Sequence, residues 1–186
     1  MAPKPLVTSD AYERLCLAGE IGPSELVDGE IIMMAPGGFE HSFTSNRVGM
    51  MLSNFVVGRK LGRVLANEAG IHLDKEKGRS CGADVVFISY KRIPREERPR
   101  GFLTIPPELI VEVLPDDGSW TDMEKKVDEY HAFGVEMVWV ADPNTRTVKL
   151  YPRGGEARIV HDGSELDGAP VLPGFKVPVA KFFDED

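Results

Sequence analysis

Three residues have the types and spacing that hydrolysis of a phosphate ester requires. Glu112 stands inside the apolar run Leu109–Leu114, which is rich in β-branched residues and predicts a strand buried on both faces of a sheet. Asp84 opens a second apolar run, residues 83–89, and Lys126 lies one turn into the helix predicted after Glu112. A buried, ionised carboxylate is costly, so a cation or several hydrogen-bond donors must meet Glu112.

Two different arrangements would offset the cost of burying Glu112. On neighbouring strands, Asp84 and Glu112 would offer oxygen ligands to Mg²⁺ or Mn²⁺. Lys126 would then orient or deprotonate a water, or stabilise charge developing on a phosphate. A buried ion pair between Glu112 and Lys126 would also offset the cost, without any metal. The residues alone leave both arrangements open.

A long helix is predicted ahead of the strand that carries Asp84. Its apolar positions continue from about Glu40 to Gly58, and a hairpin with Asp28-Gly29 at its turn precedes it. His41 lies on the apolar stripe near the helix start, next to Glu40. A carboxylate there favours the helix dipole, which explains the pair without a catalytic role.

Two short β-type segments on either side of Glu68 and Ala69 predict a second hairpin. His72 and Asp74 share one face of the second segment. Two such residues make a poor metal signature, so we interpret them as surface polar positions.

The helix after Glu112 is predicted to begin at Thr121, which has capping-box spacing with Glu124. At 100° per residue, Lys126 borders the apolar stripe of this helix, whereas Lys125 points to water. Asp122 could also pair with Lys126 at i, i+4.

Residues 91–107 predict a long loop that is basic within an acidic chain. Loops of this length are usually functional or mobile, so this is the candidate phosphate-contacting segment, with Arg95 and Arg98 as its substrate-binding residues. A solvated loop would explain the same charges. The basic residues are Lys91, Arg92, Arg95, Arg98 and Arg100.

Composition predicts one domain, residues 1–186, with peripheral edge strands in the tail that follows residue 152. The net charge of −8 argues against broad attraction to nucleic acid, although a local basic patch remains compatible with it. No apolar stretch is long enough to span a membrane, and residues 1–6 lack a signal-peptide core. We therefore expect a cytoplasmic protein whose two cysteines, Cys16 and Cys81, are not crosslinked.

The common nucleotide-binding, esterase and metalloprotease motifs, GxGxxG, GxxxxGK[ST], GxSxG and HExxH, do not occur. The chain instead resembles the Uma family of putative restriction endonucleases over roughly residues 20–152. Five segments carry this resemblance in the same order and spacing: ELVDGEIIMM, the Glu40-His41 helix start, ADVVFI, LIVEVL and DMEKKVDEYHAFGVEMVWVAD.

This family is part of the PD-(D/E)XK nuclease superfamily, so the resemblance implies an α/β fold: a restriction-endonuclease-like mixed sheet flanked by helices, with added hairpins. By position, it implies that Asp84 and Glu112 bind the metal and that Lys126 is the catalytic lysine. Leu114 stands where the superfamily more often has that lysine, so the helical lysine must substitute for it. Ala83 replaces the proline of the PD motif.

We therefore expect an Mg²⁺- or Mn²⁺-dependent endonuclease acting on DNA, and the resemblance further implies a homodimer. Glu40 is the candidate for an additional metal or water contact, and His41 for a contact with phosphate or with a ligand residue. Two other functions stay open: an inactive binding or scaffold protein that kept the fold, and a hydrolase of a small phosphorylated substrate, which the net charge favours.

Overall fold

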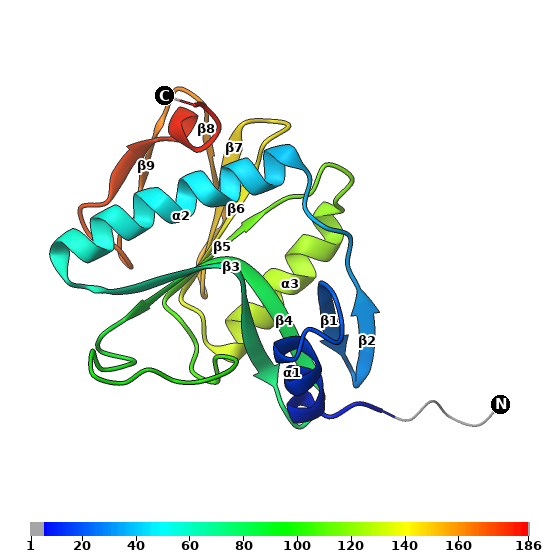
Figure 1. The fold of residues 1–186 in the computed structure, drawn as a ribbon. Coiled ribbons are helices and arrows are strands. Elements are labelled where there is room, and N and C mark those ends of the chain that lie inside the picture. Colours follow the sequence, from blue (N-terminus) through cyan, green and yellow to red (C-terminus); the bar gives the residue numbers. More distant parts are fainter. Residues whose placement is uncertain (1–5, 186) are drawn as a thin grey trace.

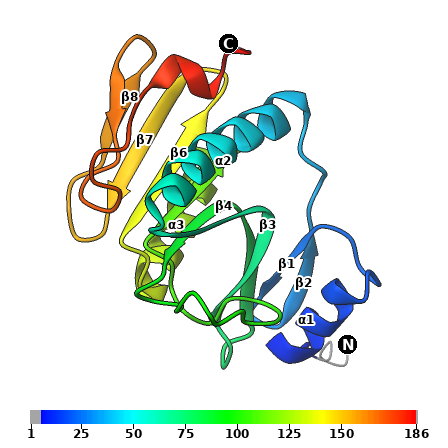
Figure 2. The same cartoon turned by 60° about the vertical axis from the view of Figure 1, so that its left-hand side comes forward.

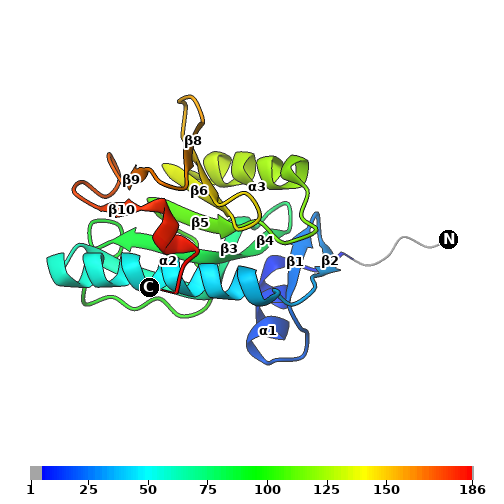
Figure 3. The same cartoon turned by 90° about the horizontal axis from the view of Figure 1, so that it is seen from above.

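Three layers make up the protein: a helix, a β-sheet and a second helix. The structure is a computed structural model that describes residues 6–185, so residues 1–5 of the segment examined for a signal peptide lie outside it. Figure 3 shows α2 (Phe39–Arg59) and α3 (Trp120–Phe133) on opposite faces of the sheet. The short helix α1 (Ser9–Leu17) packs at one end.

The main sheet has eight strands in the order β2-β1-β4-β5-β6-β7-β8, with β3 pairing with the other edge of β4 (Figures 1 and 2). Only β5 and β6 run parallel; the other neighbours are antiparallel. The strands are β1 (Ser24–Val27), β2 (Glu30–Met33), β3 (Gly62–Asp74), β4 (Arg79–Ser89), β5 (Leu109–Val113), β6 (Met137–Asp142), β7 (Thr147–Pro152) and β8 (Arg158–His161).

Each helix buries the apolar stripe that its sequence predicts. Val48, Leu52 and Val56 of α2 are fully buried against one face of the sheet, as 3.6-residue periodicity requires. The predicted core face of α3 packs on the other face through Met123, Val127 and Tyr130. The two cores are therefore separated by β4 and β5, the strands that carry Asp84 and Glu112.

The predicted hairpin around Glu68 and Ala69 is wrong, because β3 is one long strand. Both halves of β3 pair with β4, and a β-bulge interrupts the register between them. Asn67 and Glu68 adopt left-handed backbone conformations there, with φ of 69° and 56°. Turns and bulges use the same left-handed residues, which is why a turn was expected here.

Two helices, α1 and α3, begin directly after a capping side chain, and the cap of α3 differs from the predicted one. The hydroxyl of Thr8 caps α1 by accepting a hydrogen bond from Ala11 N–H. Ser119 caps α3, so the helix begins at Trp120 instead of at Thr121. The exposed Asp122 pairs with Lys125 at 2.8 Å and leaves Lys126 free to point at the sheet.

The tail contributes to the core, which its Gly- and Pro-rich composition did not indicate. The predicted strands near residues 159 and 178 are present as β8 and β10 (Lys176–Pro178), and β10 pairs with β9 (Glu165–Asp167) in a separate sheet. A short 3₁₀ helix, Val179–Phe182, follows. Leu166, Leu172 and Phe182 of this tail are buried against the α2 side of the sheet.

Between residues 6 and 185, none of the helices is long and apolar enough to cross a membrane. The two cysteines are not crosslinked, and Cys81 is buried.

Candidate active site

Asp84 lies at the point where the sheet divides. Along one edge, β4 pairs with β1 at Ser80 and with β5 from Val85 onward, so Asp84 stands between the two partners. Its side chain is buried, and Oδ2 accepts a hydrogen bond of 2.8 Å from Val113 N–H. The Asp84 carboxylate thus satisfies the backbone N–H of Val113, which lies beyond the last residue pair between β4 and β5. Asp84 was expected at the entrance of a strand but lies within β4, which begins five residues earlier.

Glu112 is the neighbour of Asp84 across this gap. The β4–β5 register pairs Val85 with Val111, and its next step would pair Asp84 with Glu112. Glu112 is 4% exposed, and its Oε1 accepts a 2.5 Å hydrogen bond from the Tyr130 hydroxyl. Burial raises the pKa of Glu112 to about 7; the attraction of Lys126 opposes this rise, and the charge of Asp84 adds to it.

Lys126 reaches the site from α3, as its position beside the apolar stripe predicts. Its Nζ lies 3.4 Å from Glu112 Oε1 and 2.9 Å from Glu25 Oε1, and it donates a hydrogen bond of 3.3 Å to the Gly82 carbonyl. Burial would lower the pKa of Lys126, but attraction to Glu112 and Glu25 outweighs burial and raises it well above its ordinary value. The ammonium group is therefore charged at neutral pH. Leu114, in the position of the usual lysine, is buried in the α3-side core.

His41 approaches from the opposite face of the sheet, on the first turn of α2. Its Nε2 lies 3.2 Å from Asp84 Oδ2. This hydrogen bond raises the pKa of His41; burial opposes the rise, and the charges of Asp84, Glu112 and Glu68 reinforce it. Glu40 precedes His41 in the chain but is exposed, and it has no hydrogen bond or ion pair with a described residue. The structure therefore brings His41, but not Glu40, into contact with Asp84.

Each of the two buried carboxylates keeps one oxygen without a partner. Among residues 6–185, Oδ1 of Asp84 and Oε2 of Glu112 accept no hydrogen bond, yet neither is sealed from solvent. Two unsatisfied carboxylate oxygens at one place are the donors that Mg²⁺ and Mn²⁺ prefer. The chemistry of these residues fits a divalent cation.

The predicted substrate-binding arginines lie on the loop that follows β4. Arg95 approaches the ring of Tyr90, 6.0 Å away, and Arg98 lines a cavity of about 530 Å³ that is also bordered by residues of β3. Arg63 holds the first part of this loop by donating hydrogen bonds to four of its carbonyls, among them that of Arg95. The loop then runs back beside β3. Among the described residues, neither arginine forms an ion pair with Asp84 or Glu112.

Sequence reasoning missed two members of the site. Glu25 of β1 pairs with Lys126, but nothing local in the sequence predicts that β1 lies beside β4. Tyr130 was assigned only to the core face of α3, although a buried tyrosine hydroxyl usually needs a polar partner, and that could have marked it.

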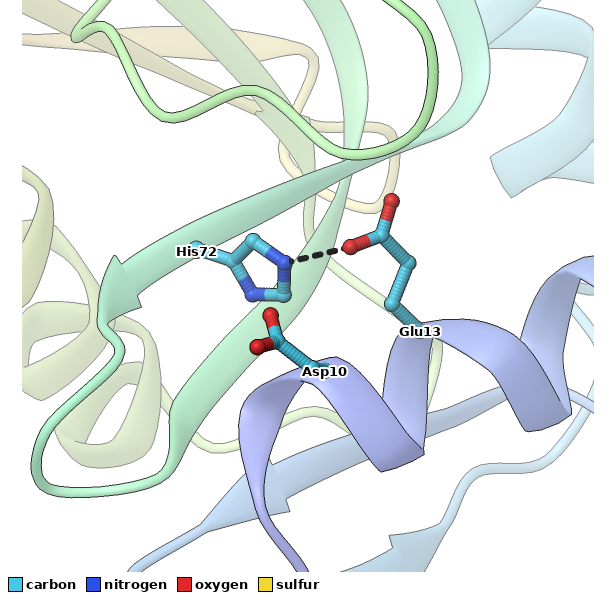
Figure 4. Close-up of side chains that lie close together, drawn as sticks. All are labelled: Asp10, Glu13 and His72. Carbon is cyan, nitrogen blue, oxygen red and sulfur yellow. Dashed lines mark hydrogen bonds and ion pairs between the residues drawn. The ribbon is translucent and has the colours of Figure 1, made fainter.

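A second group of carboxylates and a histidine occurs between α1 and β3 (Figure 4). Asp10, Glu13 and His72 place their ligand atoms within 4.8 Å of one another. His72 is buried, which corrects its interpretation as a surface residue. Its Nε2 lies 2.9 Å from Glu13 Oε2 and its Nδ1 2.7 Å from Ser80 Oγ.

The groups of this cluster are already satisfied within the protein. Phe102 N–H donates to the second oxygen of Glu13, and Lys75 pairs with Asp10 at 2.5 Å. Both nitrogens of His72 are also used. The cluster connects α1 to β3 and to the long loop. Neither Glu13 nor His72 has a ligand atom without a partner that could bind a metal.

A mixed sheet between two helices, divided at two carboxylates that a lysine approaches, is an arrangement that suits hydrolysis of a phosphodiester. The Uma2 family model, described as "Putative restriction endonuclease", matches residues 9–180. The chain belongs to this family. Comparison with curated proteins gave no match.

A solved structure has the same fold. It is described as a putative nuclease belonging to DUF820 from Anabaena variabilis ATCC 29413, and the two chains align with a TM-score of 0.77. The alignment covers 95% of this chain and 97% of that chain, at 22% sequence identity. The predicted fold class, a mixed sheet flanked by helices with added hairpins, is confirmed.

Proposed function

We propose that the protein is a divalent-metal-dependent endonuclease that hydrolyses phosphodiester bonds in DNA. One observation carries the proposal: Asp84 and Glu112 meet where the sheet divides, each with a free oxygen, and a charged lysine stands beside them. Membership of a family of restriction-endonuclease type supports the same reaction class.

Asp84 and Glu112 would hold Mg²⁺ or Mn²⁺, which supplies a polarised phosphate oxygen and an activated water. Because its pKa is raised, Lys126 keeps its protons at neutral pH, so it serves as a hydrogen-bond donor and positive charge instead of as a base. It would orient the attacking water or stabilise charge developing on the phosphate. His41 holds the Asp84 carboxylate from the other face of the sheet.

DNA as the substrate rests on the family and on the basic loop. Arg95 and Arg98 would contact phosphates away from the scissile bond, since neither forms an ion pair with Asp84 or Glu112 among the described residues. The exposed Glu40 would contribute through a water, because it contacts none of the carboxylates. A homodimer, implied by resemblance, would place two such sites on one duplex.

The test is cleavage of supercoiled plasmid with Mg²⁺ or Mn²⁺ and with EDTA. We expect nicking that needs the metal, that is lost in Asp84→Asn and Glu112→Gln, and that persists in Glu76→Gln, which removes an exposed carboxylate elsewhere on the β3–β4 hairpin. Circular dichroism checks that each variant is folded. Metal-independent nicking, or full activity in Glu112→Gln, would overturn the proposal.

A second candidate is a binding protein that keeps the fold without activity. The observation that favours it is the pairing of Lys126 with both Glu112 and Glu25, which neutralises part of the buried charge without a metal. Titrating Mn²⁺ into the protein separates the two functions. A cation that binds only the folded state raises the melting temperature, whereas no rise at millimolar Mn²⁺ favours the binding protein.

The net charge of −8 favours a third candidate, hydrolysis of a small phosphorylated substrate. Parallel assays on plasmid and on a small phosphodiester, such as bis-p-nitrophenyl phosphate, decide between the substrates. Turnover of the small ester without plasmid nicking would replace DNA as the substrate while keeping the site.

A further inference from the structure

The β-bulge of β3 lies directly opposite Asp84. Ala66 pairs with Val85 and Ala69 pairs with Ala83, so two residues of β3 face the single residue Asp84 of β4. Those two residues are Asn67 and Glu68. Bulges of this kind redirect side chains and recur beside active sites. The bulge therefore places Glu68 on the strand segment opposite Asp84.

The conformation of this bulge is costly for the residues that form it. Asn67 and Glu68 both have positive φ, a left-handed conformation that is unfavourable for residues other than glycine. Asn tolerates it, but Glu does not favour it. Glycine at position 68 would relieve the strain but would remove the carboxylate.

A glycine on the facing strand makes room for Glu68. A Cβ added to Gly82 would lie 3.0 Å from the Glu68 Cβ, tighter than nine in ten such contacts, so a side chain at position 82 would require Glu68 to shift by a few tenths of an ångström. The Gly82 carbonyl also accepts the hydrogen bond from Lys126. Glu68 is thus packed against the residue that helps to position the lysine.

The Glu68 carboxylate has no partner that would explain its position. It is exposed, and it forms no hydrogen bond or ion pair within residues 6–185. Its charge is nevertheless felt by His41, which contacts Asp84. Among the described residues, Lys126 pairs with Glu112 and Glu25, and His41 contacts Asp84, so one lysine and one histidine meet three carboxylates before Glu68 is counted.

We propose that Glu68 is an additional oxygen ligand, directly or through one water, of the divalent cation held by Asp84 and Glu112. This inference rests on the proposed metal site. The bulge, and not a regular strand, directs the carboxylate to the cation, and the cation would neutralise the excess negative charge.

The experiment measures Mn²⁺ binding to the full chain by calorimetry and by electron paramagnetic resonance of free Mn²⁺. The proteins are the wild type, Glu68→Gln, Glu112→Gln and the matched control Glu76→Gln, whose charge change is identical and whose carboxylate is exposed at the far turn of the same hairpin. Melting in EDTA checks that folding is unchanged. We expect the Kd to rise about tenfold or more in Glu68→Gln and to stay at the wild-type value in Glu76→Gln.

The outcomes distinguish the two proposals. If the wild type binds Mn²⁺ and Glu112→Gln does not, but Glu68→Gln binds within twofold of Glu76→Gln, the role of Glu68 is overturned and the metal site stands. If the wild type itself does not bind Mn²⁺ at millimolar concentration, the metal site fails and Glu68 fails with it. If the wild type binds Mn²⁺, Glu112→Gln does not, and Glu68→Gln binds more weakly than Glu76→Gln, the inference is supported.

Discussion

Two regions of the molecule place carboxylates beside a histidine, and they satisfy those groups in opposite ways. Between α1 and β3, both oxygens of Glu13 and both nitrogens of His72 have partners. At the division of the sheet, Asp84 and Glu112 each retain an oxygen without a partner, although both are more than nine-tenths buried.

The difference teaches that residue types alone do not identify a metal site. Asp10, Glu13 and His72 have the types and distances of a metal site, yet both oxygens of Glu13 and both ring nitrogens of His72 are used in hydrogen bonds, and Lys75 pairs with one oxygen of Asp10. Asp84 and Glu112 bury negative charge that nearby positive groups only partly neutralise. Buried charge without full compensation is expensive, so it persists where function requires it.

The largest expected effect is on cleavage. Glu112→Gln should lower the rate of metal-dependent plasmid nicking by about 10³-fold, because it replaces a metal-binding oxygen. Glu13→Gln makes the same chemical change in the satisfied cluster and should leave the rate within about threefold. Initial rates at saturating Mn²⁺ measure both. Equal losses of nicking rate in Glu112→Gln and Glu13→Gln would show that the two groups of carboxylates do not differ in function.

The next largest effect is on the free energy of unfolding, and we expect it for a substitution in the cluster between α1 and β3. His72→Ala removes a buried ring and leaves Oε2 of Glu13 and the Ser80 hydroxyl without the partner they have in His72, so we expect a loss of about 2–4 kcal/mol in the free energy of unfolding. Urea denaturation measures it, with the exposed Asp10→Asn as the control. The rise in melting temperature with Mn²⁺ should persist in His72→Ala; its disappearance would move the metal to the α1–β3 cluster.

The pH dependence of stability should have opposite signs in the two regions. Burial raises the pKa of Glu112 from 4.5 to about 7, so between these values the folded state keeps a proton that the unfolded state has lost. In EDTA, wild-type stability should therefore fall relative to Glu112→Gln as pH rises through this window, by a few kcal/mol at most, roughly 1–3.

Glu13 should show the reverse trend. Burial raises its pKa, but the hydrogen bonds from His72 and Phe102 outweigh burial and lower it. The stability that Glu13 contributes is therefore present above its unfolded pKa of 4.5 and is lost on acidification below it. Melting curves of wild type, Glu112→Gln and Glu13→Gln from pH 3.5 to 8 test both trends. A pH-independent difference between wild type and Glu112→Gln would contradict the buried charge.

The smallest effect concerns the basic loop. Arg95→Ala with Arg98→Ala should weaken DNA binding several-fold in about 0.1 M salt and reduce the salt dependence by about two phosphate contacts. Metal binding should stay unchanged, because neither arginine forms an ion pair with Asp84 or Glu112 among the described residues. Fluorescence anisotropy with labelled duplex at several salt concentrations measures both quantities. An unchanged salt dependence would remove Arg95 and Arg98 from the DNA surface.

Local patterns predicted the parts of the fold that local physics decides. The Asp28-Gly29 hairpin and both long helices are present, and 100° periodicity correctly turned Lys126 toward the sheet and Lys125 toward water. Periodicity works here because the helix must bury one stripe, and the position of a lysine beside that stripe is fixed by geometry.

Non-local pairings could not be predicted in the same way. The burial of His72 depends on α1 packing over β3, and Glu25 meets Lys126 only because β1 pairs with β4. Asn67 and Glu68 favour a turn or a bulge equally, and only the pairing of both halves of β3 with one strand decides between them. The sequence thus indicated the carboxylates and the lysine, but not the residues that surround them.

The lysine on α3 has a consequence for how the site can be adjusted. A lysine at position 114 would be fixed to Glu112 by two peptide bonds of one strand, whereas Lys126 belongs to a separate layer. Its alignment with Glu112 depends on how closely Met123 and Val127 seat the helix on the sheet. Tyr130 on the same helix also donates a hydrogen bond to Glu112, so a small change in that seating shifts two contacts of this carboxylate. The distance between Lys126 and Glu112 therefore depends on the docking of a helix, and we expect core substitutions beneath α3 to change it from outside the site.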